Sequence, residues 1–192
     1  MKRILILLAL IVVGVSSAQA QTKEFLELFN KVRTNVQRAA EYNYSYYDGF
    51  EVAQYPADML RTMGLKDPIN GRNVLNNLRV IYQVKISSMS KTKQYANSVY
   101  RQFDNLTDAS RKPRLYEQYM CQTAKNKEVR VYKAIKRKNS PNEYMVLIRD
   151  KEKDKAMICD IVGYIDIEDV MTMLSLELKN YANVDSLAIG NK

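Results

Sequence analysis

Four β-rich runs in the second half of the chain constrain the fold more than any other feature of the sequence. They cover residues 115–121, 129–135, 144–149 and 156–162, and short polar, charged or proline-containing segments separate them. Parallel pairing of neighbouring strands would need a crossover of a dozen or more residues, and these segments are shorter. The sequence therefore predicts a four-strand antiparallel meander.

Helical periodicity at three places supplies a layer that can cover such a sheet. Residues 23–40 and 90–107 carry an apolar residue every three or four positions, which is the spacing of one helix face. Asp166 is a good N-cap for a closing helix, in which Ile167, Val170, Met171 and Leu174 share one face. We expect these helices to pack on one face of the sheet.

An earlier pair of strands precedes the meander. Val80, Tyr82, Val84 and Ile86 alternate with polar residues within residues 79–86, which predicts a strand with one buried face. A shorter strand is expected at residues 50–54, followed by a short helix that Pro56 opens and Gly64 closes. The prediction is a single α+β domain over residues 21–178, with a largely antiparallel sheet of about five to six strands and a weakly ordered tail over 179–192.

The N-terminus has the three-part pattern of a cleavable signal peptide over residues 1–20. A basic start precedes an apolar run of twelve residues, which is shorter than the roughly 20 that cross a membrane, and small residues follow. Cleavage is predicted between Ala20 and Gln21. Because residue 21 is not cysteine, no lipid anchor is expected. The mature chain is predicted to be exported to the periplasm or secreted, with no transmembrane segment.

Several kinds of chemistry are excluded by composition. The chain has no histidine, which removes histidine-based metal sites and nucleophile arrangements, and it has no phosphate-binding glycine loop. Neither a cofactor nor a metal is predicted. Cys121 and Cys159 lie in apolar runs and are expected to be interior, either as free thiols or joined in a disulfide.

The two densest groups of acidic residues are explained by structural roles. Asp166, Glu168 and Asp169 suit the start of the closing helix, where acidic side chains complement the helix dipole. Residues 150–155 have the composition of a solvated hairpin turn.

Two groups of residues are candidate binding surfaces. The first is a set of tyrosines, which could contact sugars or peptides or pack against the first helix: Tyr42, Tyr44, Tyr46 and Tyr47. The second is a basic run, which could contact an anionic polymer or form a solvated strand end: Lys133, Lys136, Arg137 and Lys138. The net charge of +9 serves solubility as well as attraction to an anionic envelope, and no nucleic-acid partner is expected.

Three segments together resemble a bacterial family called domain of unknown function 4252. They are residues 50–60 (FEVAQYPADML), 78–82 (LRVIY) and 162–170 (VGYIDIEDV), and the likeness spans most of residues 25–174. The resemblance implies an exported or envelope-attached protein of a Gram-negative bacterium. It implies no catalytic residues. The preferred hypothesis is a non-enzymatic envelope or secreted accessory protein that binds a macromolecule or an anionic surface polymer, and the alternative is a hydrolase that uses paired carboxylates with a tyrosine.

Overall fold

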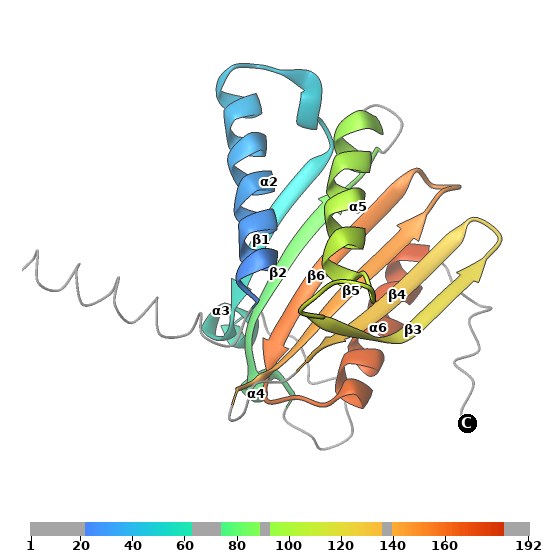
Figure 1. Ribbon diagram of the computed structural model, residues 1–192. Helices are drawn as coiled ribbons and strands as arrows, with labels where there is room; N and C mark the ends of the chain where they lie inside the picture. Colours follow the sequence, from blue (N-terminus) through green and yellow to red (C-terminus); the bar gives the residue numbers. More distant parts are fainter. Residues whose placement is uncertain (1–21, 63–73, 89–92, 136–139, 183–192) are drawn as a thin grey trace, which may run out of the picture.

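One antiparallel sheet of six strands organises the computed structural model, which describes residues 22–62, 74–88, 93–135 and 140–182 (Figure 1). The strands are β1 (Phe50–Pro56), β2 (Leu78–Ile86), β3 (Tyr116–Ala124), β4 (Lys127–Ala134), β5 (Asn142–Asp150) and β6 (Lys155–Gly163), in the order β1-β2-β6-β5-β4-β3. The predicted α+β class is confirmed.

The C-terminal half of the sheet is the predicted meander. β3 pairs antiparallel with β4, β4 with β5, and β5 with β6. The two tightest turns contain Lys125 and Asp154, whose positive φ angles of 50° and 56° reverse the chain over a few residues. The antiparallel pair of β1 and β2 joins the meander along β6, where Val84 lies opposite Ile158. The last strand in sequence is therefore a central strand in space.

The helices follow the periodicity closely. They are α2 (Lys23–Glu41), the short 3₁₀ helix η2 (Ser45–Tyr47), α3 (Ala57–Thr62), α4 (Val74–Asn77), α5 (Lys93–Thr107) and α6 (Ile167–Ala182). Pro56 is the last residue of β1, and α3 begins one residue later. Gly64, the expected end of that helix, lies outside the described residues, as do residues 183–192 of the predicted tail.

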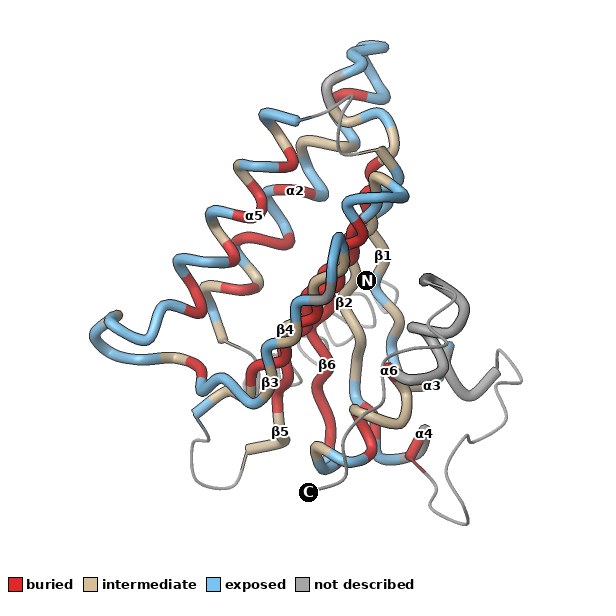
Figure 2. The backbone as a smooth tube through the Cα atoms, turned by 90° about the vertical axis from the view of Figure 1, so that its right-hand side faces the viewer, coloured by how far each residue is buried: buried red, intermediate tan, exposed pale blue. Residues whose placement is uncertain are grey.

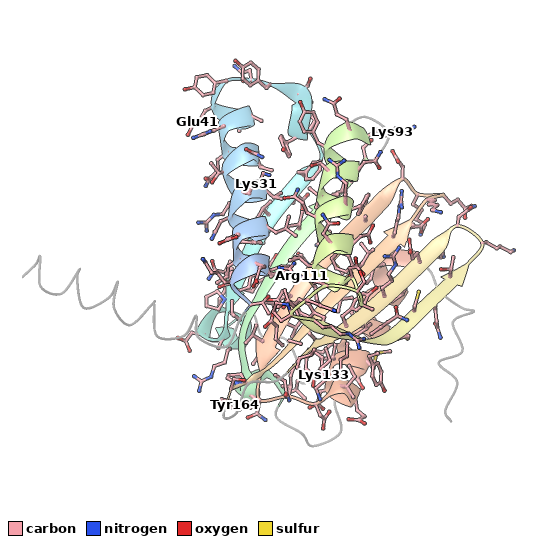
Figure 3. All side chains as sticks on the ribbon, viewed as in Figure 1. Lys31, Glu41, Lys93, Arg111, Lys133 and Tyr164 are labelled. Atoms are coloured by element: carbon pink, nitrogen blue, oxygen red, sulfur yellow. The ribbon has the colours of Figure 1, made fainter. Side chains whose placement is uncertain are left out.

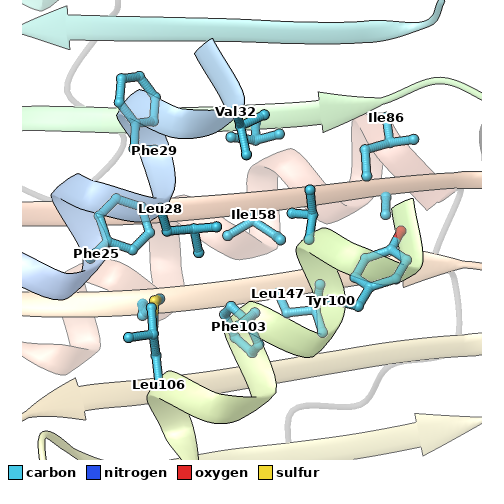
Figure 4. Packing of buried hydrophobic residues seen from close by; sticks show 14 of the residues in the cluster. Phe25, Leu28, Phe29, Val32, Ile86, Tyr100, Phe103, Leu106, Leu147 and Ile158 are labelled. Atoms are coloured by element: carbon cyan, nitrogen blue, oxygen red, sulfur yellow. The ribbon is translucent and has the colours of Figure 1, made fainter. Parts of the chain in front are cut away.

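One face of the sheet is covered by α2 and α5, which run side by side across it (Figures 1 and 4). Phe25 and Phe29 of α2 and Phe103 of α5 are fully buried over the sheet, where they meet Leu147 and Ile158. Burial of an aromatic or aliphatic side chain of this size contributes about 1.5–3 kcal/mol to folding. This layer fixes both helices to the central strands.

The opposite face carries a second core under α6. Val146 of β5 and Ile161 of β6 pack there with Val170 and Leu174 of α6. The helices therefore lie on both faces of the sheet, and the expectation of helices on one face only is wrong. The reason is visible in β5 and β6, where nearly every residue is buried: a strand with both faces covered has no apolar and polar alternation. In Figure 2 these central strands are almost continuously red, while the outer sides of α2 and α5 are pale blue.

Candidate functional site

The tyrosine-rich segment forms the connection between the end of α2 and the start of β1. Tyr42 is the C-cap residue of α2, and its N–H donates to the carbonyl of Arg38 at 3.1 Å. Asn43 adopts a left-handed φ of 54°, and the N–H of Tyr44 then returns to the carbonyl of Ala39 at 2.8 Å. The backbone of this connection is thus tied to the last turn of the helix.

The tyrosines of this segment point in different directions. Tyr42 and Tyr44 are 64% and 52% exposed, and their rings stack with centroids 5.8 Å apart and an interplanar angle of 24°. Tyr47 turns inward against Phe50 and Tyr95, with ring centroids 5.0 and 4.9 Å away. Sequence reasoning left surface and packing roles open for all of them, and the structure assigns packing to Tyr47 and exposure to Tyr42 and Tyr44.

Tyr47 is held by a polar contact as well as by its ring. Its hydroxyl accepts a hydrogen bond from Asn35 Nδ2 at 3.0 Å. Burial raises the pKa of Tyr47, and the hydrogen bond from Asn35 opposes that shift with a smaller effect. The hydroxyl is therefore neutral at physiological pH and acts as a structural contact. The side chain of Tyr46 lies outside the described residues.

A cavity of about 410 Å³ opens beside the exposed tyrosine pair. Val36, Ala39 and Phe50 supply apolar lining, whereas Asn43 and Asp48 supply polar groups. Tyr44 lines the cavity as well, so the stacked pair and the hollow are continuous. We call Tyr42, Tyr44 and this cavity the tyrosine pocket. Figure 3 shows its neighbourhood at the end of α2 marked by Glu41.

The predicted basic cluster is described only at Lys133. This residue lies on β4, is partly exposed, and stands opposite Glu117 of β3 in the strand register (Figure 3). Lys136, Arg137 and Lys138 lie outside the described residues. A carboxylate directly across the strand pair offsets the charge of Lys133, so this lysine alone makes a weak site for an anionic polymer.

A buried group that sequence reasoning missed joins the start of α2 to β3 and β5. Glu143 Oε2 accepts the Thr22 N–H at 2.9 Å, and Glu143 Oε1 accepts both the Thr22 hydroxyl at 2.9 Å and the Tyr116 hydroxyl at 2.6 Å. The hydroxyls of Thr22 and Tyr116 also contact each other. We call Thr22, Tyr116 and Glu143 the N-terminal anchor. No local pattern signals it, because its members are far apart in the sequence.

The N-terminal anchor is closed to solvent. Glu143 and Tyr116 are 3% and 1% exposed, and Asp160 of β6, which contributes to the raised pKa of Tyr116, is fully buried. Burial also raises the pKa of Glu143, while the hydrogen bonds from Tyr116 and Thr22 act in the opposite direction. A hydrolase built from a carboxylate and a tyrosine needs a substrate within hydrogen-bond reach of both groups. Here α2 lies over them.

The carboxylates at the start of α6 form the predicted cap. Asp166 Oδ1 accepts the Asp169 N–H at 3.0 Å, and Asp169 Oδ2 accepts the Asp166 N–H at 3.3 Å. This reciprocal arrangement satisfies N–H groups at the helix start. Asp166 and Asp169 also line a cavity of about 500 Å³, together with Asn142 and Tyr164. Asp150 likewise closes its turn by accepting the Lys153 N–H at 2.9 Å.

The two cysteines occupy different environments. Cys159 of β6 is buried, as predicted, but Cys121 of β3 is exposed, so the expectation that both are interior is wrong. Neither cysteine is joined in a disulfide. Strands β4 and β5 separate them, which at about 4.8 Å per strand exceeds the Cα separation a disulfide allows. The edge position of β3 and the β-bulge between Gln118 and Met120 explain why Cys121 is exposed. Neither feature is evident from the composition of the sequence, which is why the prediction failed for this residue.

Within the described parts of the chain, no group of three or more Cys, Asp or Glu residues is arranged to hold a metal ion. No helix there is long and apolar enough to span a membrane.

Comparison with protein families confirms the resemblance that the three sequence segments suggested. The model of the Domain of unknown function (DUF4252) matches residues 44–173, which include all six strands and α5. The chain belongs to this family. The DUF4252 match begins at Tyr44, so α2 and Tyr42 precede it, and it covers most of residues 25–174, as expected. No curated protein and no solved structure matches the chain.

Proposed function

We infer that this DUF4252 protein is an exported, non-enzymatic binding domain of the bacterial envelope that holds a macromolecule at the tyrosine pocket. The observation that carries this proposal is the stacked, exposed pair of Tyr42 and Tyr44 beside a cavity of about 410 Å³. Exposed tyrosine rings offer large contact area at a small cost in conformational entropy, which is why they are frequent in binding surfaces.

Export is supported by the leader pattern of residues 1–20, which lie outside the described part of the chain. On this proposal the leader is removed after Ala20 and the domain acts in the periplasm or outside the cell. The absence of cysteine at residue 21 argues against attachment by a lipid.

Binding is favoured over hydrolysis by the roles that the carboxylates already fill. Asp166 and Asp169 cap α6, and Glu143 holds the start of α2 in the interior. Asp166 and Asp169 also line the cavity beside Tyr164, but an oxygen of each accepts an N–H group of the α6 cap. In the tyrosine pocket, Asp48 has no second carboxylate among the described residues that line the cavity. Paired carboxylate chemistry requires two.

The pocket is also placed on a rigid support. Gly49, at the start of β1, accepts hydrogen bonds at its carbonyl from the N–H and the hydroxyl of Ser87, just after β2, at 2.8 and 3.1 Å. Tyr47 is wedged between β1 and α5 through Phe50 and Tyr95. A binding surface on such a connection can present its side chains in a fixed geometry.

The test compares matched tyrosine variants on envelope material. The full chain is expressed with its leader and recovered from the periplasm, and its intact mass should correspond to a start at Gln21. Binding to isolated envelope fractions should weaken at least about fivefold when Tyr42 and Tyr44 are both replaced by Ala, since each ring supplies about 0.5–1.5 kcal/mol or more of contact. Tyr119→Ala is the control, because Tyr119 of β3 is equally exposed at 54% but distant in the fold.

The contrary results are equally specific. Unchanged binding of the double variant, with loss of binding when the basic run over residues 133–138 is replaced by Gln and Ser, would transfer the function to that run. Release of products from envelope polymers by the purified protein would favour the hydrolase.

A further inference from the structure

The surroundings of the tyrosine pocket carry negative charge. Asp48 is the charged side chain among the described residues that line its cavity. The cavity also abuts the carbonyl end of α2 through Ala39 and Ala40, and a helix of 19 residues carries the equivalent of about half a negative charge there. Glu41, the last residue of α2, adds a further carboxylate at this end.

Aromatic faces complete an environment suited to a cation. The faces of tyrosine rings are negative because of their quadrupole, and they attract a guanidinium or ammonium group within about 6 Å of the ring centroid. The fold already uses this contact elsewhere, with Arg149 over Tyr100 at 4.7 Å and Arg79 over Tyr164 at 5.3 Å. Tyr42 and Tyr44 stack on each other and remain more than half exposed, so ring surface outside their mutual contact is open to solvent.

Among the described residues, no lysine or arginine lines the cavity of the tyrosine pocket. Arg38 lies in the last turn of α2 and Lys93 at the first turn of α5, but neither lines the cavity. The net charge of the chain is +9, so any attraction for a cation must be local. Screening over about 8–10 Å at ordinary ionic strength separates the pocket from most of that surplus.

We propose that the tyrosine pocket binds an arginine or lysine side chain of a protein partner, with Asp48 as its charge partner and Tyr42 and Tyr44 as its aromatic faces. This inference rests on the proposed binding function and names the ligand of the same site. Arginine fits better than lysine, because its planar guanidinium can stack on a ring and donate to a carboxylate at once. An anionic polysaccharide would be repelled by Asp48 and by the carbonyl end of α2. A neutral sugar would gain no electrostatic attraction from either group.

The experiment uses arginine and citrulline peptides against the mature protein recovered from the periplasm. Citrulline has nearly the shape of arginine and no charge, so a flexible Gly/Ser peptide with three arginines and its citrulline counterpart form a matched pair. Titration followed by calorimetry should show the arginine peptide binding at least about tenfold more tightly. Asp48→Asn should reduce that preference at least about threefold, Tyr44→Ala should reduce affinity, and Tyr119→Ala should change neither.

The failures of the two proposals can be told apart. Equal affinity for arginine and citrulline peptides, or a preference unaffected by Asp48→Asn in a protein with an unchanged melting temperature, overturns the cationic ligand. If envelope binding still depends on Tyr42 and Tyr44, the proposed binding function survives that result. If neither the peptides nor the envelope fractions respond to the tyrosine substitutions, both proposals fall.

Discussion

Replacing Glu143 by Gln would remove the charge from the N-terminal anchor and keep the size of the side chain. Three donors point at Glu143: the N–H and hydroxyl of Thr22 and the hydroxyl of Tyr116. A glutamine oxygen can accept both hydroxyls, but its amide then faces the Thr22 N–H, donor against donor. A buried donor left without an acceptor costs about 1–3 kcal/mol. At acid pH the wild-type side chain is a neutral carboxyl, and its hydroxyl oxygen can still accept the Thr22 N–H, which an amide nitrogen cannot do. We therefore expect Glu143→Gln to be destabilising at acid pH.

The size of this deficit should depend on pH. Burial raises the folded-state pKa of Glu143, with the hydrogen bonds from Tyr116 and Thr22 opposing it and Glu24 adding to it. The native state therefore holds the proton more tightly than the unfolded state. Between the ordinary glutamate pKa of about 4.3 and the raised value, the wild-type protein loses stability as pH rises, at most by about 1.4 kcal/mol per pH unit. Glutamine does not titrate, so the deficit of the variant should shrink towards neutral pH.

Urea unfolding of both proteins at several pH values between about 4 and 8 measures the difference directly. Glu117→Gln is the control, because Glu117 lies on the exposed side of β3 and should change stability by no more than about 0.5 kcal/mol throughout. A deficit that grows as pH rises would refute the reasoning. It would mean that the three donors stabilise the carboxylate more than burial penalises it.

Three further expectations concern other parts of the fold. Gly163→Ala should destabilise by about 1–3 kcal/mol in urea unfolding, because a Cβ there would lie 2.6 Å from a backbone oxygen at the end of α4; wild-type stability would show that the backbone can yield. Asp166→Ala should cost about 0.5–2 kcal/mol, since the Asp169 N–H loses its acceptor, and Asp166→Asn should cost less. A polar maleimide should label Cys121 rapidly in the native protein and Cys159 only on unfolding, as followed by mass spectrometry; equal rates would contradict the burial of Cys159.

The parts of the fold that could be predicted from sequence are those with a local signal. The helices α2 and α5 follow from apolar spacing, and the meander follows from short connections that exclude parallel crossovers. The position of α6 on the opposite face from α2 and α5 could not be predicted in the same way. It depends on helices covering both faces of β5 and β6. An unbroken apolar run in a strand does not indicate which helix covers which face.

The candidate site shows the same division between local and distant information. The tyrosines were evident as a cluster, but only their environment separates Tyr47, packed against Phe50, from the exposed Tyr42 and Tyr44. The cavity beside them arises where α2 meets β1, so no spacing in the sequence predicts it. The role of Glu143 was hidden for the same reason, because its partner Thr22 is 121 residues away.

That separation has a consequence for the order in which the chain can take shape during synthesis. The ribosome makes α2 first, yet the acceptor for Thr22 emerges only 121 residues later. Strand β6, which joins the antiparallel β1–β2 pair to β5, is the last strand to be made. An incomplete chain can form local helices and separate strand pairs, but the two parts of the sheet are not joined until β6, which ends at residue 163, has been added. The complete six-stranded sheet can therefore form only after most of the chain has been synthesised.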